Sequence, residues 1–205
     1  MTSEPGTRRE HDRTATNGTI RVVAMVGSSR QGSYNRALLQ AARESAPASV
    51  AIELIEMGDL PFFDADLEAR GDPVPVRRLK TAIAQADALL IVTPEYNRSL
   101  PAVLKNALDW ASRPPRPSAL AGKPVLLLGA SAGRSAASHA IQHATDVLAN
   151  IGAAPFERSL GVPRAGDLID ASGRLADERT LEELRRLLLD FERAVRSGGS
   201  LRAAA

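Results

Sequence analysis

The sequence predicts an α/β protein with one doubly wound parallel sheet of five strands and helices on both faces. Strand-like apolar runs alternate along the chain with stretches of helical periodicity, in the order expected of β-α-β units. The chain of 205 residues, 44% of them apolar, is long enough for one sizeable core and too short for two typical domains. We therefore expect a single domain over residues 20–196, a disordered lead over residues 1–19 and a flexible tail over residues 197–205.

Each expected element follows from its own pattern. The strands are expected at Ile20–Val26, Val50–Glu56, Ala88–Thr93, Pro124–Ala130 and, more weakly, Ala154–Arg158. The helices are expected at Asn35–Ser45, Val74–Ala84, Pro101–Ala111, Ser135–Ile151 and Asp177–Ser197. The third helix starts with a proline, which suits a first helical turn. The fifth has the helical spacing of a segment that closes the sheet, with Leu181, Leu184, Leu188 and Phe191. This alternation fits the flavodoxin-like fold, with strand order 2-1-3-4-5.

Composition and charge exclude several kinds of function. Cysteine is absent, which excludes disulfides, zinc-thiolate sites, iron–sulfur clusters and cysteine nucleophiles. The formal charge of +2 comes from the C-terminal end, where three arginines and no acid follow Glu192. The nearly neutral remainder gives no case for a nucleic-acid partner. The polar first residues carry no signal-peptide core and no membrane-spanning run follows, so we expect a cytoplasmic protein without a membrane partner.

A junction rich in Gly and Ser, residues 27–35, separates the first expected strand from the first expected helix. A helix N-terminus offers unpaired backbone N–H groups and a partial positive charge, and small residues let a phosphate approach them. The side chains that suit a phosphate here are those of Ser28, Ser29, Arg30, Ser33 and Asn35. The junction has neither an ATPase loop ending nor a dinucleotide fingerprint, which favours a mononucleotide. A plain capped turn is the alternative.

Two further loops belong at the same end of the sheet, because ligands of this topology bind where the strand order reverses. The loop after the third strand reads Thr93-Pro-Glu-Tyr-Asn-Arg-Ser-Leu-Pro101. The loop after the fourth strand reads Ala130-Ser-Ala-Gly-Arg-Ser135 and is again rich in small residues. Together the three loops predict a crevice for a flat aromatic ring with a phosphate tail, although a single loop of this kind is also compatible with a structural role.

The motifs also resemble those of a known family. Gly-Ser-x-Arg-x-x-Ser-x-Asn, followed by Thr-Pro-Glu-Tyr-Asn and by Leu-Lys-Asn-Ala-Leu-Asp-Trp, is similar to the NADPH-dependent FMN reductases, and most similar to their bacterial quinone and chromate reductases. The likeness runs from Ile20 to Val195 and includes Leu60-Pro-Phe-Phe-Asp-Ala-Asp-Leu-Glu68, Leu120-Ala-Gly-Lys-Pro-Val125 and Gly161-Val-Pro-Arg164. The resemblance implies FMN as the bound cofactor and NADPH or NADH as a transient co-substrate.

Carried over position by position, the resemblance implies a site for FMN. The FMN phosphate would be held by Ser28, Arg30, Ser33, Tyr34 and Asn35. The isoalloxazine ring would be lined by Pro94, Glu95, Tyr96 and Asn97. The site would be completed by Ser131 and Gly133, with Arg134 beside them, in a loop where the family pattern is variable. No catalytic acid or base is implied, because the flavin carries the chemistry.

The resemblance further implies an enzyme that passes hydride from NAD(P)H to flavin N5 and then to a quinone, a flavin, an azo compound or a metal oxyanion, in ping-pong fashion. It implies a homodimer or homotetramer with Trp110 and the Arg98 region as candidate contacts, although the helical pattern around Trp110 also predicts core packing.

Two alternatives to an enzymatic function stay open. One is a flavodoxin-type electron carrier, which the absence of a strongly acidic surface disfavours, and the other is a redox-linked regulatory protein without turnover.

Two other groups of residues favour structural interpretations. His139 and His143 have a spacing that can hold a metal on a helix, but the third histidine, His11, lies in the lead, so no metal site is predicted. Asp64, Asp66 and Glu68 form an acidic group. This group lacks the glycine and ligand spacing of a calcium loop, so it predicts a solvated surface loop.

Overall fold

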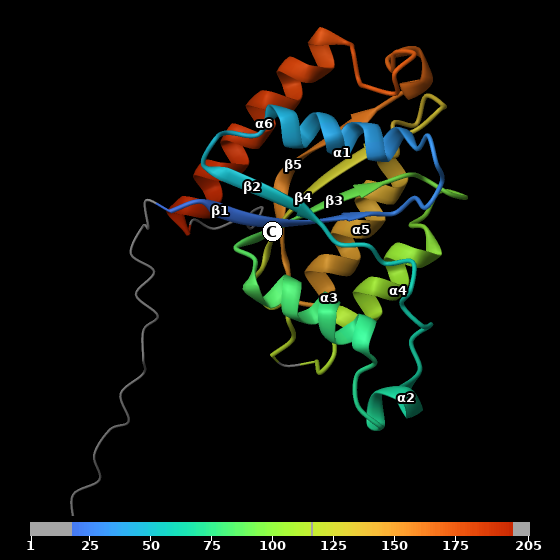
Figure 1. The fold of residues 1–205 in the computed structure, drawn as a ribbon, viewed down its shortest axis with the longest axis vertical. Coiled ribbons are helices and arrows are strands. Elements are labelled where there is room, and N and C mark those ends of the chain that lie inside the picture. Colours follow the sequence, from blue (N-terminus) through green and yellow to red (C-terminus); the bar gives the residue numbers. More distant parts are fainter. Residues whose placement is uncertain (1–17, 116, 199–205) are drawn as a thin grey trace, which may run out of the picture.

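The computed structural model describes residues 18–115 and 117–198, which form a five-stranded, all-parallel sheet in the order β2-β1-β3-β4-β5 (Figure 1). The strands are β1 Ile20–Val26, β2 Val50–Leu54, β3 Ala88–Thr93, β4 Pro124–Ala130 and β5 Ala154–Val162. The helices are α1 Tyr34–Ser45, α2 Ala65–Ala69, α3 Val74–Gln85, α4 Ala102–Ala111, α5 Ser138–Asn150 and α6 Glu178–Ser197, with a 3-10 turn η1 at Ala165–Asp167. The predicted flavodoxin-like fold and its strand order are confirmed. The expected lead and tail fall mostly on residues 1–17 and 199–205, outside the described residues.

Two layers of helices cover the sheet, α1 and α6 on one face and α3, α4 and α5 on the other (Figure 1). Successive residues of the central strands divide between the two layers. In β3, Leu90 and Val92 belong to the cluster with α1 and α6, whereas Leu89 and Ile91 belong to the cluster with the other helices. Every residue of β3 is buried. This two-sided burial explains why the central strands are continuous apolar runs. None of the described helices combines the length and the apolar character that a membrane span requires.

Several element ends differ from those expected. β5 continues to Val162 because it pairs with the whole end of β4, where Ala130 lies opposite Val162. α5 begins at Ser138 and not at Ser135, because Ala136 and Ala137 adopt left-handed φ angles of 53° and 58°. An alanine in this conformation gives no sequence signal, since the conformation favours glycine and is imposed here by the surrounding chain.

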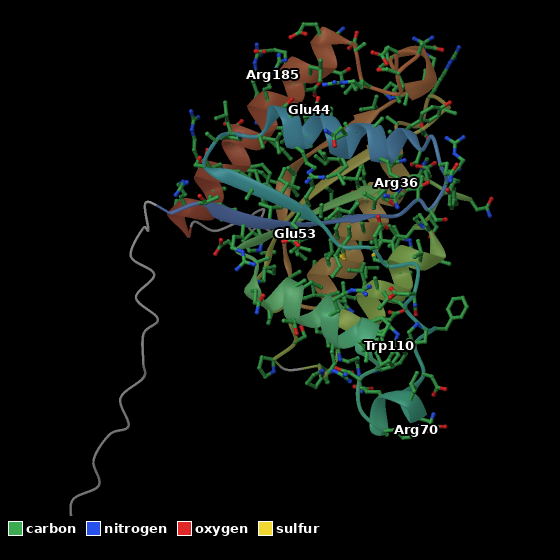
Figure 2. The ribbon with its side chains drawn as sticks, in the orientation of Figure 1. Arg36, Glu44, Glu53, Arg70, Trp110 and Arg185 are labelled. Atoms are coloured by element: carbon green, nitrogen blue, oxygen red, sulfur yellow. The ribbon has the colours of Figure 1, made fainter. Side chains whose placement is uncertain are left out.

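The acidic segment after β2 is not the irregular loop that the sequence predicted. It contains the short helix α2, which projects from the body of the molecule and ends near Arg70 (Figure 2). Asp64 caps this helix by accepting hydrogen bonds from the backbone N–H groups of Asp66 at 2.8 Å and Leu67 at 3.4 Å. Glu68 forms an ion pair with Arg113 at 3.1 Å. A helix of five residues is too short to show periodicity, so its cap was the only available signal.

The parallel sheet brings the carboxyl ends of its strands to one edge of the molecule. At that edge Val26 of β1 lies opposite Val92 of β3, and Thr93 of β3 lies opposite Gly129 of β4. The backbone N–H of Gly27 donates to the carbonyl of Val92 at 2.9 Å, directly beyond the last paired residues. The loops that follow these strands therefore start side by side.

Candidate functional site

The loop between β1 and α1 is built around the cap of α1. Ser33 is the N-cap, and its hydroxyl accepts a hydrogen bond from the Arg36 N–H at 3.4 Å. Ser28 and Ser33 are 5% and 4% exposed, so both hydroxyls are held inside the loop and not in solvent. A Cβ on Gly27 would lie 3.1 Å from Pro101 Cγ and 3.2 Å from Pro94 Cδ. Glycine at this position therefore lets the loops after β1 and β3 meet.

The start of α1 offers what an anion needs. In the described part of the chain, the backbone N–H groups of Tyr34 and Asn35 have no protein acceptor, as expected in a first helical turn. No acidic residue lies in that turn. Arg30 is exposed, and its guanidinium lies 5.2 Å from the centre of the Tyr34 ring, with no carboxylate partner among the described residues. Unpaired donors, a helix dipole and a free cation together suit a phosphate group.

Asn35 fastens this helix start to β4. Its side-chain amide donates to the carbonyl of Ala130 at 3.0 Å and accepts from the N–H of the same residue at 2.9 Å. The side chain is only 3% exposed. Both ends of the amide thus serve to position α1 against the last residue of β4. A direct contact between Asn35 and a phosphate stays a prediction.

The loops after β4 and β5 are joined by backbone hydrogen bonds. Ser131 N–H donates to Val162 at 3.0 Å, Ala165 N–H donates to Ser131 at 2.9 Å, and Arg164 N–H donates to Gly133 at 2.8 Å. The expected site residues Ser131 and Gly133 therefore lie in one framework with the segment that follows β5. This framework also reaches α1, because a Cβ on Gly166 would lie 2.9 Å from the Tyr34 hydroxyl oxygen.

The loop after β3 carries a tight two-residue turn at its tip. Tyr96 and Ser99 exchange backbone hydrogen bonds of 3.1 and 2.9 Å across the turn. The two central residues, Asn97 and Arg98, have left-handed φ angles of 50° and 61°, which is the pattern of a type I′ turn. Tyr96 is 52% exposed, whereas Pro94 is buried. The turn therefore presents Tyr96 and Asn97 at the surface from a fixed base.

Glu95 ties this loop to the start of α5. Its carboxylate accepts from the backbone N–H of His139 at 2.9 Å and lies 3.2 Å from Nδ1 of the same residue. α5 has no side-chain cap of its own, so Glu95 caps it from another loop. Burial of the Glu95 side chain favours the protonated acid, but the hydrogen bonds from His139 and Ala140 outweigh burial and lower the pKa of the carboxyl below its ordinary value. Glu95 is therefore ionised at neutral pH.

The two histidines of α5 contact the same loop. His139 Nε2 lies 2.6 Å from Arg98 Nη2, and His143 Nδ1 lies 3.0 Å from the Ser99 hydroxyl. Among the described residues, no group of three or more His, Asp or Glu side chains could hold a metal ion. These contacts were not predicted from the sequence. The available signal was the four-residue spacing of the histidines, which places them on one face of a helix.

The motif Leu104-Lys-Asn-Ala-Leu-Asp-Trp110 has a structural role. Trp110 of α4 (Figure 2) is fully buried. Its Nε1–H donates to the carbonyl of Pro61 at 2.8 Å, and its ring meets Phe63 edge-on at 5.0 Å. Asn106 donates to the same carbonyl at 2.9 Å and accepts from the Phe63 N–H at 2.8 Å. The motif therefore anchors the loop after β2. Core packing of Trp110 is confirmed, and its expected role as a subunit contact is wrong because the indole has no exposed surface.

The fold and the site define a class of protein. It is a flavodoxin-like protein whose loops after β1, β3, β4 and β5 are joined around a helix start that suits a phosphate. The model of the NADPH-dependent FMN reductase family matches residues 20–167. The chain belongs to this family, so it is an oxidoreductase of the kind that uses FMN with NAD(P)H.

Individual relatives agree with this assignment. The chain is 41% identical over 178 residues to an NAD(P)H-dependent FMN reductase of Pseudomonas aeruginosa, with 86% of this chain and 96% of the relative covered. It is 41% identical over 160 residues to a quinone reductase of Pseudomonas putida, with 77% and 85% covered. Among solved structures, the flavoenzyme NAD(P)H:(acceptor) oxidoreductase FerB from Paracoccus denitrificans matches with a TM-score of 0.81 and 34% identity, over 88% of this chain and 100% of that chain.

Proposed function

We propose that this protein transfers electrons from NAD(P)H to quinones by a ping-pong sequence, in which both substrates would use the same FMN site in turn. The observation that carries the proposal is the joining of the loops after β1, β3, β4 and β5 beside the unpaired donors of α1. When bound, FMN would supply the hydride chemistry. The names of the relatives, an FMN reductase and quinone reductases, support the two half-reactions.

The protein's own residues would bind and orient the cofactor. Ser28, Arg30 and Ser33, with the backbone of Tyr34 and Asn35, would hold the phosphate. Asn35 would keep the helix start in place through Ala130. The ring would be lined by Pro94, Glu95, Tyr96 and Asn97 and bordered by Ser131 and Gly133. No side chain is assigned a proton transfer.

Three finer points belong to the proposal. Free flavins, azo compounds and metal oxyanions such as chromate are proposed as further acceptors, since an open flavin site reduces acceptors by redox chemistry and not by a dedicated substrate pocket. The active form is proposed to be a homodimer or homotetramer, which light scattering of the purified holoprotein would reveal and a monomer would contradict. The cytoplasm, where NAD(P)H is available, is the proposed compartment.

Absorbance spectroscopy of the FMN-loaded protein tests the proposal. Anaerobic NADPH or NADH should bleach the flavin band at about 450 nm, and a simple benzoquinone should restore it. Initial rates with both substrates varied should give parallel double-reciprocal lines. FMN that binds but is bleached by neither nucleotide would favour the electron carrier or the regulatory protein, and failure to bind FMN would refute the proposal.

A further inference from the structure

His139 lies between two charged residues of the loop after β3. Its Nδ1 is 3.2 Å from Glu95 Oε1, and its Nε2 is 2.6 Å from Arg98 Nη2. Its backbone N–H adds a third bond, 2.9 Å to Glu95 Oε2. One residue of α5 therefore connects the base of the loop, at Glu95, with the tip of the loop, at Arg98.

The partners of the ring fix its protonation state. A guanidinium has only N–H donors, so Nε2 can bond to Arg98 only as an acceptor. The ring proton must then reside on Nδ1, where it is donated to the Glu95 carboxylate. His139 is thus required as the neutral Nδ1–H tautomer, and a second proton on Nε2 would face the Arg98 cation without a lone pair between them.

Arg98 depends on this contact for its position. It occupies the second left-handed position of the turn, with φ 61°, which carries a steric cost for a residue with a Cβ. Its side chain has no carboxylate partner among the described residues. Arg134 and Arg164, on loops joined through the Arg164–Gly133 bond, are also exposed without a carboxylate partner in the described part of the chain. We call these three exposed arginines, Arg98, Arg134 and Arg164, the rim of the site. The rim carries positive charge that no carboxylate among the described residues neutralises.

We propose that His139 is a positioning residue that acts through Arg98 in binding the phosphates of NAD(P)H. The inference rests on the proposed function, because NAD(P)H must approach the ring that this loop is proposed to line. The FMN phosphate is assigned to the start of α1, so the rim cations are free for a second anionic ligand. Through its Nε2, His139 holds the Arg98 guanidinium at the rim.

Two substitutions separate the two bonds of the ring. His139→Asn keeps a short N–H donor for Glu95 and removes the acceptor for Arg98. His139→Gln keeps a longer amide whose oxygen can accept from Arg98. We expect His139→Asn to raise the KM for NADPH about tenfold at pH 8, the loss of one charge-assisted hydrogen bond, with kcat at saturating NADPH nearly unchanged. His139→Gln should recover most of the affinity.

His143→Gln is the matched control, because it alters the same helix and the same loop without touching Glu95 or Arg98. A second readout does not use turnover. Calorimetric binding of NADP⁺ to the FMN-loaded protein should weaken by the same factor in His139→Asn and in Arg98→Ala. In the protein without FMN, the ¹⁵N spectrum of the His139 ring should show the Nδ1–H tautomer.

The outcomes distinguish this inference from the proposed function. A wild-type protein whose FMN is reduced by NADPH, together with a His139→Asn variant that has wild-type KM and wild-type NADP⁺ binding, would overturn the inference alone. An Nε2–H tautomer would overturn it as well. A wild-type protein that binds FMN without reduction by either nucleotide would instead refute the proposed function.

Discussion

Arg30 and Glu95 both bring charge to the site, but they use it in opposite ways. Arg30 is exposed, and among the described residues its guanidinium contacts the Tyr34 ring and no carboxylate, so its charge is available to a ligand. The side chain of Glu95 is 10% exposed, and its carboxylate bonds to His139. The charge of Glu95 therefore stabilises the start of α5. In the sequence, the motifs of both residues predict ligand contacts. The structure shows that Arg30 is available to a ligand, whereas Glu95 holds the loop after β3 against α5.

Removing the Arg30 guanidinium should weaken FMN binding without unfolding the protein. We expect Arg30→Ala to lose about one to two decades in affinity, because a charge-assisted phosphate contact contributes on the order of 1.5–3 kcal/mol. Fluorescence titration with FMN measures the change. Arg43→Ala, at the far end of the same helix, is the control and should bind FMN like the wild type. Equal affinity of Arg30→Ala and wild type would remove Arg30 from the phosphate site.

Neutralising Glu95 should cost stability in a pH-dependent manner. The folded-state pKa of Glu95 lies below its ordinary value of 4.5, so the ionised carboxylate stabilises the fold fully above that pH. This contribution disappears as the pH falls through the folded-state pKa. We expect Glu95→Gln to lower the free energy of unfolding by about 1–2 kcal/mol at pH 7.

Urea unfolding at several pH values measures this difference, which should shrink below about pH 4.5. Glu53→Gln, on β2 (Figure 2), is the matched control, because the Glu53 side chain is exposed and has no hydrogen-bond partner among the described residues. A loss of stability for Glu95→Gln that does not change with pH would show that the charge of Glu95 does not contribute.

At the scale of elements, glycines in the strands decide where the loops of the site lie. A Cβ on Gly161 of β5 would overlap the carbonyl oxygen of Ala136, and a Cβ on Gly129 of β4 would lie 2.7 Å from the Ala137 Cβ. The left-handed residues before α5 can therefore pack directly against the sheet. This close approach holds Ser131 and Gly133 beside the segment after β5.

Adding a methyl group at Gly161 should displace this loop. We expect Gly161→Ala to lower the free energy of unfolding by about 1–3 kcal/mol, since the overlapping atom belongs to the backbone and cannot turn aside. FMN affinity should fall in parallel. Denaturant unfolding and FMN titration measure the two effects. Gly58→Ala, where a Cβ meets nothing within 4 Å, should change neither, and a stable Gly161→Ala with normal FMN binding would show that the loop tolerates the shift.

At the scale of the whole molecule, the site forms only when the sheet is complete. Its parts come from the ends of four strands and are connected by bonds between distant residues, such as Asn35 to Ala130 and Glu95 to His139, 95 and 44 positions apart. An unfolded chain cannot keep these parts together, so it should not bind FMN with comparable affinity. Binding must therefore stabilise the fold.

FMN should raise the unfolding free energy of the protein without cofactor by about 2.7 kcal/mol at a concentration one hundred times its Kd. Thermal unfolding with increasing FMN measures the effect. Riboflavin has the same ring but no phosphate, so at the same concentration it should raise Tm by much less. Equal shifts with the two flavins would contradict the assignment of the α1 start to the phosphate.

The sequence by itself determined the strands, their order and the loop that suits a phosphate. Continuous apolar runs such as Ala88–Thr93 can be buried only in the middle of a covered sheet, and a Gly/Ser junction before a helix exposes backbone donors whatever surrounds it. The apolar runs and the junction depend on neighbours within a few positions, and the strand order follows from the alternation of strands and helices along the chain. They are therefore readable from one chain.

The tertiary structure alone decided which side chains face the site. Glu95 proved to cap α5, Asn35 proved to bridge α1 and β4, and His139 proved to connect Glu95 with Arg98. The left-handed turns at Arg98 and Ala136 were equally invisible, since packing imposes them on residues that do not prefer them. The physical reason is that these features arise from contacts between segments tens of residues apart, whose distances are set only when the helices close over the sheet.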